Sequence, residues 1–167
     1  MPLCLLIMLA ACGGKGIKNG NGEFIVKYGN DDLSAFAGHT IWLRSWDNDG
    51  DPIYLFNTDN LKGDCALPYR VIIDRKKAVV KRQNRSEADS MAVCPVDTAM
   101  AVQLALKLFE YEAAYIHVDS NRNIFVQINY NKSRDELAKF SAGTLPDNEH
   151  SKWKSLKNGW YERNSPQ

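Results

Sequence analysis

The sequence predicts an α+β domain: an antiparallel sheet of hairpins packed on one long central helix, followed by a short helical C-terminal region. Two observations favour this fold class. Strand-like segments rich in β-branched and aromatic residues occur in pairs, and turn-forming residues separate the members of each pair. In the middle of the chain, an uninterrupted stretch carries apolar residues at helical spacing.

The first elements expected are a strand and a short helix. Residues Glu23 to Tyr28 alternate weakly between polar and apolar side chains, which favours a strand. Asp31 to Ala37 is closed by Gly38, and glycine often follows the last residue of a helix. A short helix is therefore expected over residues 31–37.

Three hairpins are predicted, with turns at 47–51, 74–77 and 119–123, where Asp, Asn, Gly and charged residues gather. Their strands are His39–Trp46 with Pro52–Asn57, Leu67–Ile73 with Ala78–Lys81, and Tyr115–Val118 with Ile124–Asn129. In the last strand Ile124, Val126 and Ile128 alternate, so one face of that strand is expected to be buried.

Three further helices are predicted outside the hairpins. The central helix spans Val96 to Ala113, because this stretch has no breaker and its apolar residues recur with helical spacing. Ser133 with Glu136 forms a capping box, which opens a helix ending near Gly143. A last helix over residues 148–157 is expected to stop at Asn158 and Gly159.

Composition and charge describe one ordinary soluble domain. Of 167 residues, 44% are hydrophobic and 25% charged, with 21 basic against 20 acidic side chains. No apolar run reaches the roughly 18 residues that span a bilayer. A net charge of +1 gives no long-range field that would attract nucleic acid, so no nucleic-acid partner is expected. We expect a single domain over residues 23–167.

The N-terminal residues have the pattern expected of a processing signal. Residues 1–11 have no charged side chain, and their apolar run has the length of a signal-peptide core. The run ends in Leu9, Ala10, Ala11 and Cys12, an order that resembles the lipobox of bacterial lipoproteins over residues 1–14. In that family the cysteine thiol takes a diacylglycerol, the chain is cut before the cysteine, and the new amine is acylated, typically with palmitate.

The resemblance implies a location. Residues 1–11 would be the signal peptide, Cys12 the lipidated anchor, and residues 12–22, with their many glycines, a flexible tether. In the family, an Asp after the lipidated cysteine favours the inner membrane of Gram-negative cells, whereas Gly13 follows here. The expected location is therefore the outer membrane, with the domain facing the periplasm. The alternative is a buried N-terminal strand with a free cysteine, because no Lys or Arg precedes Leu3.

Cysteine usage agrees with this compartment. Once Cys4 leaves with the signal peptide and Cys12 takes lipid, Cys65 and Cys94 remain as one pair. An oxidising periplasm would join them in a disulfide. The closed loop of about 30 residues would stabilise the fold by roughly 3 to 4 kcal/mol in the chain-entropy model.

The turn at 47–51 also resembles part of a calcium loop. Asp47, Asp49 and Asp51 match the first three ligands of an EF-hand, but Pro52 and Thr58 replace the required Gly and Glu. A hairpin turn uses the same residue types, so we expect a turn, with a weak calcium site as the alternative.

No motif for catalysis, a metal or a cofactor is recognisable. The histidines stand far apart at positions 39, 117 and 150, without ligand spacing or a nucleophile elbow. We therefore expect a non-enzymatic protein without metal or cofactor. An enzyme with a non-local site that uses His117 is the alternative, because triads are not local in sequence.

Two surfaces are candidates for binding. The second hairpin is strongly basic, and its candidate residues are Arg75, Lys76, Lys77, Lys81 and Arg82. They would attract an acidic partner or anionic lipid and lipopolysaccharide phosphates. The alternative is a solvated hairpin whose lysines discourage strand addition. Trp153 and Trp160 lie among lysines and are the second candidate, with core packing as the alternative.

These observations predict a membrane-anchored periplasmic lipoprotein that acts as a non-catalytic protein-binding module. Its most concrete form is an inhibitor or immunity protein against an envelope-directed toxin or hydrolase. The first alternative is an envelope assembly or maintenance factor that binds lipid, lipopolysaccharide or peptidoglycan through the basic hairpin. The second is the enzyme with a non-local site.

Overall fold

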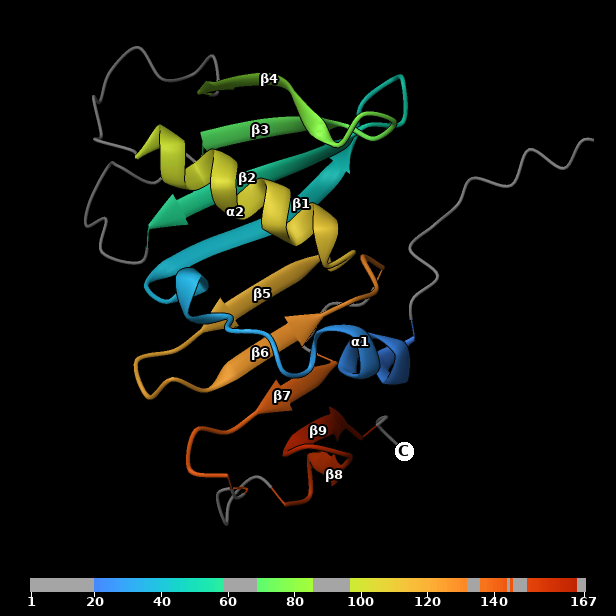
Figure 1. Ribbon diagram of the computed structural model, residues 1–167, viewed down its shortest axis with the longest axis vertical. Helices are drawn as coiled ribbons and strands as arrows, with labels where there is room; N and C mark the ends of the chain where they lie inside the picture. The colour runs from blue at the N-terminus through green and yellow to red at the C-terminus, as the bar shows by residue number, and fades with distance from the viewer. Residues whose placement is uncertain are drawn as a thin grey trace, which may run out of the picture.

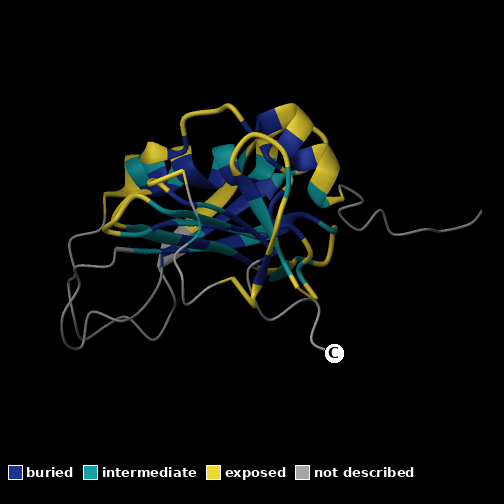
Figure 2. Cartoon of the chain, turned by 90° about the horizontal axis from the view of Figure 1, so that it is seen from below, coloured by how far each residue is buried: buried dark blue, intermediate teal, exposed yellow. Residues whose placement is uncertain are grey.

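The computed structural model describes residues 20–58, 69–85, 97–131, 136–143, 145 and 150–164. These residues form one nine-stranded sheet with the strand order β4-β3-β2-β1-β5-β6-β7-β9-β8, in which all paired strands are antiparallel. Two short α-helices lie on one face of the sheet (Figure 1 and Figure 2). Among the described residues, no helix is both long and apolar enough to cross a membrane.

The helical elements are α1 (Asn21–Tyr28), the 3₁₀ turn η1 (Ser34–Phe36) and α2 (Thr98–Glu110). The strands of the three hairpins are β1 (His39–Trp46), β2 (Pro52–Thr58), β3 (Tyr69–Asp74), β4 (Val79–Arg85), β5 (Tyr115–Val118) and β6 (Ile124–Gln127). The sheet continues with β7 (Leu137–Lys139), β8 (Trp153–Ser155) and β9 (Trp160–Arg163).

The three predicted hairpins are confirmed. In β1 and β2, Ile41 pairs with Phe56 and both side chains are fully buried. The β3–β4 and β5–β6 pairs form around the expected turns. Turn chemistry identified them because Asp and Asn side chains satisfy the backbone of a tight turn, as Asp119 does for Asn121 and Asn123.

The predicted fold class is wrong, because the described residues form mostly one nine-stranded antiparallel sheet with two short α-helices. The sheet is not packed on one long central helix, because α2 has only 13 residues and packs on β1, β2, β3 and β4. Asp97 caps its N-terminus by accepting a hydrogen bond from the Met100 amide. The short helix expected over 31–37 is the single 3₁₀ turn η1.

In the residues that the structure describes from 136 onward, the C-terminal region contains strands where helices were expected. Glu136, expected in a capping box, is buried and accepts hydrogen bonds from the amides of Ile128 and Asn129 at 2.9 and 2.5 Å. Asn158 and Gly159 both have positive φ and form the turn between β8 and β9. Asn-Gly is a strong hairpin signal, so the expected helix stop is in fact a hairpin turn.

The segment expected as the first strand is α1. Phe24, Ile25 and Tyr28 follow helical spacing, and all three are buried against the sheet. Phe24 meets Trp160 of β9 edge-to-face, with their ring centroids 5.9 Å apart. The helix begins at Asn21, so the folded part starts slightly before the expected boundary at residue 23.

Gly29 fixes the C-terminal end of α1 against the sheet. Its carbonyl accepts a hydrogen bond from the Trp160 indole at 3.0 Å and another from the Lys139 ammonium at 3.1 Å. A Cβ at this position would lie 2.4 Å from the Ile25 carbonyl oxygen and 3.1 Å from the Trp160 indole nitrogen. Glycine is therefore required by the close approach of the helix end to the sheet.

We predict opposite effects for two Gly→Ala substitutions in this region. Gly29→Ala should destabilise the domain by about 1 to 3 kcal/mol, because the new methyl group would overlap the Ile25 carbonyl of α1 and also press on Trp160. Gly22→Ala, inside α1 with no atom within 4 Å of the new Cβ, should stabilise it by about 0.5 to 1 kcal/mol. Urea denaturation of both variants tests this, and equal effects would refute the proposed role of Gly29.

Candidate functional site

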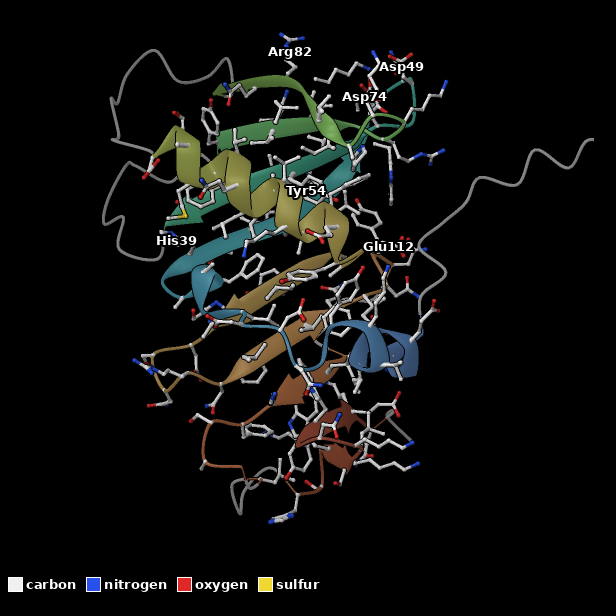
Figure 3. The ribbon with its side chains drawn as sticks, viewed as in Figure 1. His39, Asp49, Tyr54, Asp74, Arg82 and Glu112 are labelled. Carbon is white, nitrogen blue, oxygen red and sulfur yellow. The ribbon has the colours of Figure 1, made fainter. Side chains whose placement is uncertain are left out.

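Two adjacent hairpin turns form the candidate site, and we call residues 46–51 and 74–82 the turn edge. The first turn joins β1 to β2 and is closed by a hydrogen bond from the Asp47 amide to the Asp51 carbonyl. Asp47 also accepts hydrogen bonds from the amides of Asp49 and Asp51, and Gly50 takes the positive φ. Figure 3 shows Asp49 and Asp74, from the two turns, at the same corner of the sheet.

Lys81 binds the two turns together. Its ammonium donates hydrogen bonds to the carboxylates of Asp47, Asp49 and Asp51 at 2.9, 2.6 and 2.9 Å. Asp51 extends the connection, because its other oxygen accepts from the Arg75 amide at 2.9 Å. The first turn is thus attached to the second hairpin through both a side chain and the backbone.

A β-bulge positions the Lys81 side chain. In the β3–β4 ladder Ile72 pairs with Arg82 and Ile73 pairs with Val80, so Lys81 is the extra residue. A bulge changes the direction in which a side chain leaves the strand. The bulge therefore directs the Lys81 side chain toward the aspartates of the neighbouring hairpin.

These contacts shift the pKa values of Lys81, Asp47 and Asp51. Hydrogen bonds to the three carboxylates raise the pKa of Lys81 far above its usual value. The Lys81 ammonium lowers the pKa of Asp47, and the Arg75 amide, followed by Lys81, lowers that of Asp51. Because the pKa values of these two carboxyl groups are lowered, their ionised forms stabilise the fold at pH values above the ordinary aspartate pKa of 3.8. This contribution is lost as the pH falls through the lowered pKa values of the folded protein.

The three aspartates do come together, as the calcium alternative requires, with ligand atoms within 4.8 Å of one another. A carboxylate oxygen of each is, however, hydrogen-bonded to Lys81. The ammonium therefore offsets one of the three negative charges of this cluster in the folded chain.

The predicted basic surface is less positive than its sequence suggests. Among the predicted binding residues Lys81 is engaged by the aspartates, while Arg75, Lys76, Lys77 and Arg82 are exposed. Lys77 and Asp74 form a loose pair at 3.7 Å. Because the first turn contributes three carboxylates beside Asp74, five cations stand against four acids at the turn edge.

Sequence reasoning missed Trp46, which is 40% exposed at the end of β1. Its ring meets that of Tyr130 edge-to-face at 4.8 Å, and the Tyr130 hydroxyl donates to the Arg44 carbonyl. The available signal was a tryptophan directly before a turn-forming stretch, where a strand leaves the core.

The other predicted residues lie elsewhere. Trp153 and Trp160 are buried, so their side chains belong to the interior and not to a binding surface. His117 packs between the rings of Tyr115 and Phe125, with no hydrogen-bond partner at its Nδ1. Cys12, Cys65 and Cys94 lie outside the described residues.

Comparison with protein-family models, curated proteins and solved structures produced no match to this chain.

We predict that Lys81→Met lowers the melting temperature at pH 7, because three carboxylates then repel one another without a cation. The loss should shrink as the pH falls below about 4, where carboxyl groups gain protons. Lys77→Met is the control and should change little, because its ion pair is exposed and long. Thermal unfolding followed by circular dichroism at pH 7 and pH 3 measures both; a pH-independent loss would contradict the electrostatic explanation.

The same variant allows a second readout. Millimolar calcium should raise the melting temperature of Lys81→Met. Without the ammonium, the carboxylate oxygens of the three aspartates are free to bind a hard cation. The wild type should not respond, since Lys81 occupies those oxygens. Equal responses of both proteins would show that the ammonium does not hold the cluster.

Proposed function

We propose that this chain is an outer-membrane lipoprotein, anchored through Cys12, whose periplasmic domain is a non-catalytic protein-binding module. In its most concrete form it is an inhibitor or immunity protein against an envelope-directed toxin or hydrolase. The observation that carries the proposal is the Leu9-Ala10-Ala11-Cys12 sequence ahead of one domain. Anchoring restricts such a domain to partners that reach the membrane surface.

The turn edge supports the binding part of the proposal. It presents an exposed tryptophan beside exposed arginine and lysine side chains, and Trp and Arg are the residues most often found at the energetic centre of protein interfaces. The Lys81 contacts hold the two turns in one arrangement, so little conformational entropy is lost when a partner binds.

One observation favours the envelope assembly alternative. Arg75, Lys76 and Lys77 are consecutive and exposed, as expected for a surface that contacts phosphate groups of lipid or lipopolysaccharide. The two functions differ in what they need from the rest of the turn edge. A protein partner needs Trp46 as well as the cations, whereas an anionic bilayer attracts the cations alone.

The anchor has a direct test. We expect Cys12→Ala to abolish incorporation of a fatty-acid analogue, because the lipobox places only that thiol at the cleavage site. Cys4→Ala, in the expected signal peptide, is the matched control and should be labelled like the wild type. Click detection of the metabolic label after membrane fractionation measures this. Equal labelling of Cys12→Ala and wild type would refute the lipoprotein assignment.

Charge reversal distinguishes the two functions. The variant Arg75→Glu/Lys76→Glu/Lys77→Glu leaves Lys81 in place, because a fourth carboxylate among the aspartates would disturb the fold. If the domain binds a protein, capture from envelope extract by the domain starting at Gly20 should fall about tenfold, with a weaker salt dependence. If it binds lipid, the loss should appear with anionic liposomes, at about 1 kcal/mol per residue. Unchanged binding in both assays would exclude this hairpin from either function.

A further inference from the structure

The sheet has an apolar face on the side opposite α2. Side chains alternate along a strand, and the residues of β1, β2 and β3 that belong to the main core are Ile41, Leu43, Tyr54, Phe56, Val71 and Ile73. The residues between them therefore point away from α2. Four of these are apolar, and we call them the open face: Trp42, Ile53, Leu55 and Ile72.

The open face is shielded although both α-helices lie on the other side of the sheet (Figure 2). A sheet face in contact with water normally carries polar side chains. Here Ile72 is only 8% exposed, whereas Val79, on the same face of the neighbouring strand β4, is 49% exposed. Trp42 and Leu55 are half-buried. Neighbouring side chains of the sheet lie beside Ile72 and not above it, so its burial points to another part of the same chain.

Two stretches of the chain begin and end beside the open face. Residues 59–68 connect β2 to β3, and residues 86–96 connect β4 to α2; both lie outside the described residues. The register pairs Phe56 with Tyr69 and Tyr69 with Arg85. These strand ends therefore lie within two strand spacings of one another, or about 10 Å. Leu55 precedes the end of β2 by three residues, which is again about 10 Å.

The length of these stretches indicates where they pack. A turn between neighbouring antiparallel strands needs about two to five residues, whereas 10 residues separate Thr58 from Tyr69. On the other face of the sheet, α2 already packs on β1, β2, β3 and β4. The open face is thus the apolar surface that the surplus chain can reach. The two stretches carry the apolar residues that such a contact needs, namely Leu61, Leu67, Met91, Val93 and Val96.

We propose that the open face is the docking surface for residues 59–68 and 86–96 of the same chain, whose apolar side chains pack on Trp42, Leu55 and Ile72. The first stretch carries Cys65 and the second carries Cys94, so the expected disulfide would join them across this face. The inference depends neither on the lipid anchor nor on a protein partner. It assigns this face of the sheet to the interior and leaves the turn edge for a partner.

Photo-cross-linking of the purified full-length chain tests the proposal. Benzoylphenylalanine, an aromatic cross-linking residue, replaces Leu55 on the open face. Val26, 85% exposed on α1, is the control position. Labelled and unlabelled chains are mixed before irradiation, so that the masses of the digested adducts distinguish contacts within one chain from contacts between two. We expect position 55 to give adducts with residues 59–68 or 86–96 of the same chain, and position 26 to give none with either stretch.

A pair of variants measures the same contact through stability. Met91→Ser/Val93→Ser should lower the melting temperature by at least about 5 °C, because two apolar side chains lose their packing on the sheet. The same variant should bind more of the dye anilinonaphthalene sulfonate, which detects exposed apolar surface. Glu87→Ser/Asp89→Ser, in the same stretch, is the matched control and should change neither quantity.

Three results would overturn the proposal. Adducts at position 55 between labelled and unlabelled chains would assign the open face to a second copy. Adducts with lipid from the preparation would assign it to the bilayer. No adduct at position 55, together with an unchanged melting temperature of Met91→Ser/Val93→Ser, would show that neither stretch packs on the sheet. The cross-link is measured in a chain with natural cysteines and natural residues 59–68 and 86–96, so it does not depend on how well the serine variants fold.

Discussion

The Lys81 ammonium, shared by three aspartate carboxylates, is the interaction on which the arrangement of the exposed turns depends. Three carboxylates within 4.8 Å would repel one another without a cation, and the turn between β1 and β2 would lose its connection to β4. Because the pKa values of Asp47 and Asp51 are lowered and that of Lys81 is raised, the ionic contacts between these three groups persist across neutral pH. The turn edge is therefore a fixed surface and not a pair of independent hairpin tips.

The sequence predicted the elements whose local chemistry agrees with their tertiary setting. The hairpins at 47–51, 74–77 and 119–123 were identifiable because turn residues and flanking apolar strands indicate the same structure.

The wrong predictions concern residues whose local pattern fits one structure while their contacts in the folded chain belong to another. Glu136 looked like a helix-capping residue, but its carboxylate accepts backbone hydrogen bonds from the end of β6, which lies beside it only after folding. Asn158 and Gly159 were interpreted as a helix end although they equally favour a hairpin turn.

The candidate site was predictable in composition but not in arrangement. Counting Arg75, Lys76 and Lys77 along the chain correctly identified exposed cations. The count could not show that the Lys81 side chain is bound by aspartates, because its direction depends on a β-bulge and its partners lie 30 to 34 positions earlier. Trp46 was missed for a related reason. A tryptophan in a strand is usually expected in the core, whereas this one ends β1 beside the first turn and remains 40% exposed.

The anchored N-terminal side and the turn edge lie at opposite ends of the sheet. The described chain starts at Gly20, next to α1, and α1 is attached to β7 and β9 through Lys139 and Trp160. The turn edge belongs to β1, β2, β3 and β4. Seven strand spacings separate β4 from β9, which is on the order of 30 Å.

If Cys12 is anchored in the bilayer, eight residues lead from it to Gly20, and this tether spans at most about 29 Å. Because this reach is close to the separation of the two ends, the tether allows either the β7–β9 end or the turn edge to face the bilayer. The choice between a protein ligand and lipid headgroups therefore depends on the turn edge and not on the anchor: a protein partner needs Trp46, whereas an anionic bilayer attracts the cations alone.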